Sequence, residues 1–309
     1  MGFIVRMRTL LNNKDEIKKI LSDIKGLVLK IFRAMILIGV GYVIVSPAIG
    51  MVVNSISSTK DAVDPMVFIF PKAPTLEKYS LVLERLSYFK TIGKDLLYTV
   101  SLTLIQLFVC SMVGYGFARF NFKFKGLLFG CVVIMIVIPT HTVMLPWYMT
   151  FMNLGLMGTT VPMYVMTVLG CGVRSGLYIY IFNQFFRGLP KEIEEAALVD
   201  GCGMWYTYFF IMLRNALPAV VTVTVFSLVW QFNDTFFAKL FLISEDVVIS
   251  KKISSLAAVI ANQDKILEPS IQQLYVDAGI ILALLPILIM YLVLQKYFIE
   301  GVERSGIVG

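Results

Sequence analysis

Six long apolar runs dominate the sequence, at residues 34–54, 96–118, 126–149, 160–185, 215–243 and 278–299. A helix that crosses the hydrocarbon core of a bilayer needs about 20 mostly apolar residues, because each residue advances the helix by about 1.5 Å. The runs therefore predict an all-α membrane protein with six transmembrane helices. The fifth run is longer than a span requires, which predicts that it tilts or begins in the membrane interface.

The composition excludes most other classes of protein. Hydrophobic residues make up 58% of the chain and charged residues only 15%, whereas a soluble chain averages roughly 45–50% and about 25%. This excess of apolar surface has to face lipid, so a soluble enzyme and a nucleic-acid-binding domain are both disfavoured. The four cysteines show neither a disulfide framework nor the spacing of a metal site.

The basic residues indicate how the chain is oriented. Residues 1–33 carry eight Lys and Arg, including Arg6 and Arg8, whereas loop 150–159 carries none. The positive-inside rule therefore places both termini in the cytosol, although outer loops 55–95 and 244–277 also contain lysines. Apolar residues recur at helical spacing between residues 17 and 31, so segment 1–33 is either an amphipathic helix on the inner membrane surface or a simple basic anchor.

Familiar catalytic motifs are missing from the sequence. It contains no HExxH pair, no phosphate-binding G-x-x-x-x-G-K-[ST] loop and no Ser, His and Asp set around an exposed nucleophile. We therefore expect neither a catalytic site, nor a metal site, nor a cofactor bound by this chain. No internal repeat is present, which disfavours an inverted-repeat secondary transporter.

Polar residues inside the apolar runs are candidates for a translocation pathway: Arg174, Asn233, Asp234 and His141. Arg174 lies roughly 18 Å from the cytosolic end of its run, where a charge is costly and usually faces a bundle interior or a wet cavity. Arg174 is therefore either a pathway residue or a structural ion-pair or hydrogen-bond site. A pair with Asp234 requires either the reach of a side chain or helix tilt to close the difference in depth between the two residues. His141 follows Pro139 and either lines a polar cavity or bonds backbone groups freed by the helix break.

The loop 186–214 has the signals of a short helix at about 190–200. Pro190 suits the first helical position, acidic residues fill the first turns, and Gly201 suits a C-terminal stop. Alanines leave the helix with a small apolar face, which fits a groove on a partner better than it stabilises a helix alone.

In this loop Glu195-Ala196-Ala197 is followed by three residues and then Gly201. This pattern resembles the EAA motif of binding-protein-dependent ABC importer permeases, although Arg214 stands where the motif ends in proline. The residues that the resemblance assigns to ATPase coupling are Glu195, Ala196, Ala197, Asp200, Gly201, Ile211 and Leu213.

Further matches extend the resemblance over most of the chain. They lie at residues 74–79, 118–120, 139–148, 184–190, 233–234 and 297–301. Together they resemble the smaller, six-span permease of maltose-type carbohydrate importers, which have the MetI-like fold. One departure is Phe232, which stands where this branch usually has tryptophan.

The resemblance implies a function and a set of partners. It implies import of a sugar or oligosaccharide across a bacterial cell membrane, with a second homologous permease completing the pore. An ATPase dimer that holds ATP and Mg would dock on the loop, and tail 300–309 would reach it as well. A sugar-binding protein would deliver substrate from outside.

Two alternatives stay open at this point. One is a permease of the same architecture that imports glycerol phosphate or another small polar solute, for which Arg174 is suitable. The other is a stand-alone channel or ion-coupled carrier, which the EAA motif disfavours.

Overall fold

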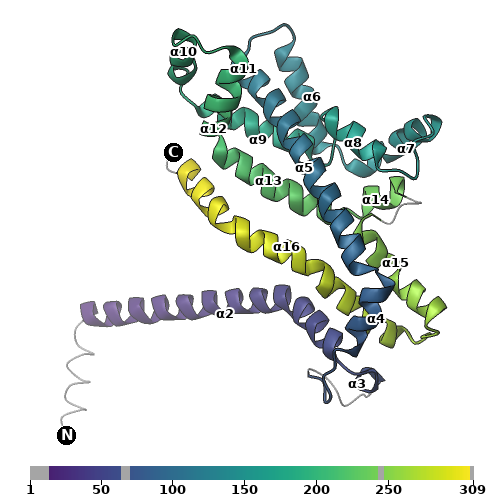
Figure 1. Ribbon diagram of the computed structural model, residues 1–309. Helices are drawn as coiled ribbons and strands as arrows, with labels where there is room; N and C mark the ends of the chain where they lie inside the picture. Colours follow the sequence, from purple (N-terminus) through teal and green to yellow (C-terminus); the bar gives the residue numbers. More distant parts are fainter. Residues whose placement is uncertain (1–13, 64–69, 243–246, 307–309) are drawn as a thin grey trace.

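The computed structural model describes residues 14–63, 70–242 and 247–306, and these ranges contain helices, turns and loops without a strand (Figure 1). The expectations for residues 1–13, with Arg6 and Arg8, and for residues 307–309 lie outside the described residues. In chain order the helices are α2 (Lys14–Ile56), α3 (Thr59–Val63), α4 (Glu77–Arg85), α5 (Tyr88–Arg119), α6 (Lys125–Val137), a 3-10 turn (Thr140–Val143), α7 (Met144–Asn153), α8 (Val161–Val168), α9 (Ser175–Gly188), α10 (Glu192–Val199), α11 (Met204–Tyr206), a π-helical segment (Thr207–Met212), α12 (Leu213–Asn215), α13 (Leu217–Phe232), α14 (Phe236–Phe241), α15 (Ile249–Gln263) and α16 (Pro269–Gly306).

Three of the described helices are long and apolar enough to cross a membrane without a break: Ser22–Ile56 within α2, the whole of α5, and Pro269–Val293 within α16. They contain the apolar runs 34–54 and 96–118 and most of the run 278–299. Two further pairs of helices are long enough only when taken together: α6 with His141–Asn153, bent by 102°, and Met204–Asn215 with α13, bent by 78°. The run 126–149 is thus a broken helix. The run 215–243 begins at the second bend and is interrupted again between α13 and α14, at residues 233–235.

The run 160–185 is not a single helix, contrary to the sequence-based expectation. It divides into α8 and α9, joined by non-helical residues 169–174. Gly170 and Arg174 both have left-handed backbone, with φ values of 71° and 60°. Gly172 lies so close to α8 that an added Cβ would approach Thr167 Oγ1 to 2.8 Å. Glycine suits positions 170 and 172, because a residue with a Cβ would be strained at the first and would overlap Thr167 at the second.

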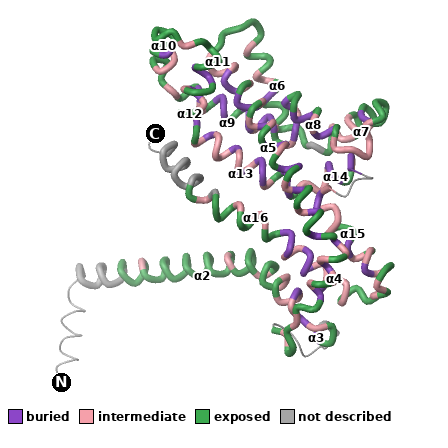
Figure 2. The backbone as a smooth tube through the Cα atoms, viewed as in Figure 1, coloured by how far each residue is buried: buried purple, intermediate pink, exposed green. Residues whose placement is uncertain are grey.

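The basic segment and the first apolar run share one helix, α2. The helix is continuous across residue 33, because residues 14–46 contain no proline that would interrupt the helical hydrogen bonds. The boundary between the cytosolic segment and the membrane domain stays a prediction. Figures 1 and 2 show α2 projecting from the other helices over most of its length, where its described residues are mostly exposed, while its last residues pack against α16. Its apolar side chains, Ile38 among them, need lipid or another chain to cover them.

Helix α5 is the central element of the molecule. It packs against α9, α13 and α8, and α4 and α15 meet it near its first residues. Gly114 permits its closest approach to α9, since a Cβ there would lie only 2.6 Å from Phe182 Cβ. Figure 1 shows that α4 and α10 lie near opposite ends of α5. The helix therefore links the two ends of the fold.

Candidate coupling helix and translocation site

The predicted short helix of the loop 186–214 is α10, Glu192–Val199. Gly201 ends it in the left-handed conformation, with φ of 82°. The Gly201 N–H donates to Leu198 O at 3.1 Å and the Cys202 N–H to Ala197 O at 2.9 Å, so carbonyls at the end of the helix are satisfied. A residue with a Cβ would be strained at this φ.

One side of α10 is open and the other is packed. Ala197 is 4% exposed, and α10 contacts the π-helical segment that follows it. Glu195, Ala196 and Asp200 are exposed, and Val199 is 87% exposed. The open side of α10 therefore carries two carboxylates, an alanine and an almost fully exposed valine.

Ile211 and Leu213 belong to the helical segments that follow α10, not to its open side. Both are half-buried, and Leu213 packs against the cluster of buried residues around α5 and α9. Arg214, at the motif's proline position, continues the helix through Asn215 because it keeps its backbone N–H. The chain bends only afterwards, at Ala216, before Pro218.

Glu194 was not among the predicted site residues, yet it connects α10 to α5. The Tyr115 hydroxyl donates to Glu194 Oε1, and Arg119 Nε lies 3.3 Å from Glu194 Oε2. Arg119 Nη2 also donates to Leu189 O at 2.9 Å. Tyr115 and Arg119 are four residues apart and so share one helix face. This spacing is compatible with a shared partner, but it does not identify Glu194 as that partner.

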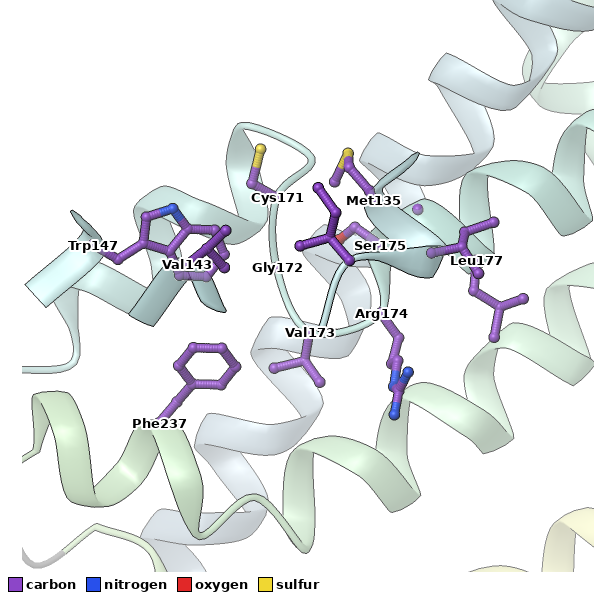
Figure 3. Close-up of a pocket in the computed structure, with 13 residues that line it drawn as sticks. Met135, Val143, Trp147, Cys171, Gly172, Val173, Arg174, Ser175, Leu177 and Phe237 are labelled. Carbon is purple, nitrogen blue, oxygen red and sulfur yellow. The ribbon is translucent and has the colours of Figure 1, made fainter. Parts of the chain in front are cut away.

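Arg174 lies at the break between α8 and α9. Its guanidinium stands over the Trp230 ring, 4.3 Å from the ring centroid, and the side chain is exposed. Figure 3 shows it pointing toward α13, away from Trp147 and Phe237. No ion pair joins Arg174 to Asp234 in the described part of the chain, so the pair considered from the sequence is not formed.

The other pathway candidates have local roles. Asp234 Oδ1 accepts the Phe237 N–H at 3.2 Å, at the start of α14. Asn233 is exposed, and its Nδ2 donates to Val229 O at 2.9 Å. The His141 ring meets the Phe236 ring edge to face, with centroids 4.5 Å apart. Asn233 lines a cavity of about 200 Å³ between the α13–α14 break, α15 and α16. Arg174 lines a separate cavity, beside the α8–α9 break.

A cavity of about 170 Å³ lies beside the α8–α9 break. Its lining is mostly apolar and aromatic, with Val143, Trp147 and Phe237 on one side and Arg174 on the other (Figure 3). Ligand sites are usually larger, at roughly 300–1,000 Å³. The cavity is therefore smaller than a typical ligand site.

A buried polar network fixes the break itself. Gln106 Nε2 donates to Val173 O at 2.7 Å and to Ser175 Oγ at 2.9 Å. Gln106 Oε1 accepts from Ser227 Oγ at 2.8 Å and from Gln231 Nε2 at 3.2 Å. Gln106 therefore joins α5, α9 and α13 next to Arg174. Gln106 was not among the predicted site residues, because one glutamine in an apolar run carries no motif.

Within the described residues, His, Cys, Asp and Glu form no group of three that could hold a metal ion.

Comparison with known proteins gives consistent matches. The family model described as "Binding-protein-dependent transport system inner membrane component" matches residues 110–304. The chain is 28% identical to Protein LplC of Bacillus subtilis (strain 168), over 92% of this chain and 96% of that protein. It is 28% identical to the arabinooligosaccharides transport system permease protein AraQ of the same organism, over 78% of this chain and 82% of that protein. It is 27% identical to the melibiose/raffinose/stachyose import permease protein MelC, also from that organism, over 78% and 84%.

A solved structure has a similar fold. It is the crystal structure of a bacterial ABC transporter involved in the import of the acidic polysaccharide alginate, and one of its chains superposes with a TM-score of 0.75. The match covers 89% of this chain and 98% of that chain, at 21% sequence identity. At this identity the likeness shows the fold alone.

Proposed function

Because the chain belongs to the family of binding-protein-dependent transport system inner membrane components, we propose that it forms one half of the pore of an ATP-driven importer for oligosaccharides. The other half is a second, homologous permease. The chain is a membrane transport component, and ATP hydrolysis, with its Mg, belongs to separate ATPase subunits. An extracytoplasmic binding protein supplies the substrate.

The observation that carries this proposal is the exposed side of α10. A short helix with Glu195, Ala196 and Val199 exposed, ended by Gly201, is a projection that no other described part of the chain covers. Small residues permit close approach, and a carboxylate can form a charge-assisted hydrogen bond with a basic group in a groove. The ATPase is the partner that this surface fits.

The proposed topology follows from the same assignment. Docking on a cytosolic ATPase puts α10 in the cytosol. It puts α4 and α15, near the other end of α5, on the outer side where the binding protein docks. Both termini are then cytosolic, and the chain crosses the membrane several times.

The class of substrate is supported by the relatives. Two of them are named as permeases for arabinooligosaccharides and for melibiose, raffinose and stachyose. An aromatic cavity wall also suits sugars, which stack on such rings through their apolar faces. Import of an oligosaccharide is therefore the proposal that the family and the site support together.

Glycerol phosphate or another small anionic solute is the second candidate. It is favoured by Arg174, whose exposed guanidinium lies over Trp230 and has no carboxylate partner in the described part of the chain. Arginine binds phosphate through paired N–H groups. Competition of uptake by neutral oligosaccharides and by glycerol phosphate separates the two substrates.

Gentle solubilisation of native membranes that contain the tagged chain tests the proposal. We expect a second permease, an ATPase and a binding protein to co-purify, and the purified complex to import sugar into vesicles only with ATP. Recovery of this chain alone, moving solute without ATP, would instead identify a channel or ion-coupled carrier.

A further inference from the structure

Two neighbouring glutamates of α10 face different surroundings. Glu195 is exposed, whereas Glu194 is only 18% exposed at its side chain and meets Tyr115 and Arg119 of α5. We name Tyr115, Arg119 and Glu194 the α5–α10 clamp. The outward glutamate is free for a docking partner, while the inward one is held by the permease itself.

The clamp holds both the helix and its connection. Arg119 is 5% exposed at its side chain, and besides Glu194 it reaches the carbonyls of Leu189 and Pro190, at 2.9 Å and 3.4 Å. These carbonyls belong to the turn between α9 and α10. Because the guanidinium contacts the turn as well as the first part of α10, the helix cannot tilt without moving the end of α5.

Tyr115 extends the clamp into the packed interior. Its ring lies edge to face with Phe186 of α9, with centroids 5.3 Å apart, and 5.0 Å from the ring of Tyr208. The Tyr208 hydroxyl is 2.7 Å from Ser111 Oγ, one turn earlier on α5. The grip on α10 therefore continues through buried aromatic and polar contacts rather than through a single exposed ion pair.

At its other end α5 holds a second helix by a buried carboxylate. Asp95 Oδ2 accepts the backbone N–H of Ile249, the first residue of α15, at 2.8 Å. The Thr99 hydroxyl donates to Asp95 Oδ1 at 3.3 Å. Asp95 is fully buried, so α15 is anchored to α5 as α10 is.

Between these two anchors α5 is continuous. Its 32 residues form one helix without proline, about 48 Å long. Sharp kinks in helices usually arise at proline, at π-bulges or where a side chain enters the backbone hydrogen bonds. Nothing of this kind interrupts α5, whereas the helices around it are broken.

We propose that α5 is the rod that carries movement of the coupling helix α10 to α15, and that Tyr115, Arg119 and Glu194 are the positioning residues that grip α10. The inference rests on the proposed function, which gives α10 and α15 their partners on opposite sides of the membrane. Loss of the clamp leaves ATP hydrolysis possible but disconnects it from the pore.

The test uses the whole complex, with its ATPase and binding protein, reconstituted in vesicles. Sugar imported and ATP hydrolysed are both measured, since their ratio reports coupling and does not change when less complex is folded. Glu194→Ala removes the clamp carboxylate. Asp23→Ala is the control, because it removes an exposed carboxylate from α2, outside the coupling helix and its docking side.

We expect Glu194→Ala to lower the sugar imported per ATP by roughly tenfold, as suits loss of a hydrogen-bonded charge, and Asp23→Ala to match the unmodified complex. Glu194→Gln keeps an oxygen that accepts the Tyr115 hydroxyl, so it recovers part of the loss. Tyr115→Phe keeps the ring contacts and shows a smaller loss in the same direction.

An unchanged ratio in Glu194→Ala and Tyr115→Phe complexes would overturn the inference. If Glu194→Ala does not assemble, Tyr115→Phe alone decides, because it removes a single hydroxyl. An unmodified complex that imports sugar without ATP would refute the proposed function instead, so the two failures are distinguishable.

Discussion

At the scale of single residues, position on α10 determines what each side chain does. Glu194 is turned inward to Arg119, Ala197 is buried, and Glu195 with Val199 remains exposed. A helix of eight residues therefore carries a packed side and a docking side. Substitutions only one residue apart should have different consequences.

Reversing the charge of Glu195 tests the docking side. We expect Glu195→Lys to abolish ATP-driven uptake, because it reverses the charge that the docking side offers to a basic group of the ATPase. The amount of chain in the membrane should stay normal, because the residue is exposed. Asp23→Lys makes the same charge change at an exposed position of α2, outside the docking side, and should retain uptake. Equal uptake by both variants would remove Glu195 from the docking surface.

Arg174 tests the pathway. Its guanidinium is exposed and stacked on Trp230, so we expect Arg174→Ala to raise the half-saturating substrate concentration by roughly tenfold, the loss of a charged contact. Arg187→Ala removes an exposed arginine from the other end of α9 and should leave the half-saturating substrate concentration unchanged. Unaltered transport kinetics in Arg174→Ala would leave the residue with a structural role alone.

At the scale of elements, the contrast between α5 and its neighbours is the main feature of the fold. The apolar runs predicted where α5 lies, because length and hydropathy suffice for an unbroken span. They did not predict the break between α8 and α9, since the two glycines on either side of Cys171 are also compatible with a membrane helix. That break depends on backbone approach to Thr167 and on Gln106 from a distant helix.

Gly114 determines how closely α5 and α9 pack. We expect Gly114→Ala to lower stability by about 1–3 kcal/mol, because the new Cβ would overlap Phe182. Gly116→Ala is the matched control, since a Cβ there meets nothing within 4 Å. Thermal unfolding in detergent measures both, and equal midpoints would contradict the close packing.

A second prediction at this scale concerns the ion pair between Arg85, at the end of α4, and Asp264, just after α15. The Arg85 guanidinium donates to Asp264, with Nη2 2.7 Å from Oδ1, and these hydrogen bonds hold the pKa of Asp264 below its ordinary value. A lowered folded-state pKa means that the pair stabilises the fold above the unfolded pKa, about 3.9, and loses this contribution as the pH falls through the folded-state value.

We therefore expect Asp264→Asn to lower the melting temperature at neutral pH, and the difference from the unmodified protein to shrink below about pH 4. Glu268→Asn removes a carboxylate from an exposed position in the same loop and should show no such pH dependence. A difference for Asp264→Asn that stays constant down to pH 3 would show that the ion pair is not its cause.

At the scale of the whole molecule, the motif at residues 195–201 predicted the family, which the match to residues 110–304 shows. Its coupling role, like the pathway candidates, stays a prediction. The α5–α10 clamp could not be predicted, because it joins Tyr115 and Arg119 to a residue that is distant in sequence. Contacts of this kind follow from packing, and only the fold brings their members together.

The central claim is that α10 docks on an ATPase. Photo-crosslinking in native membranes tests it most directly, with benzoylphenylalanine in place of Val199, which is 87% exposed. Leu267, exposed in the loop between α15 and α16, serves as the control position on the proposed outer side. The predicted result is a cross-link to an ATPase subunit from position 199 and none from position 267. Cross-linking of the ATPase from 267, or none from 199 in a complex that imports sugar, would contradict the claim.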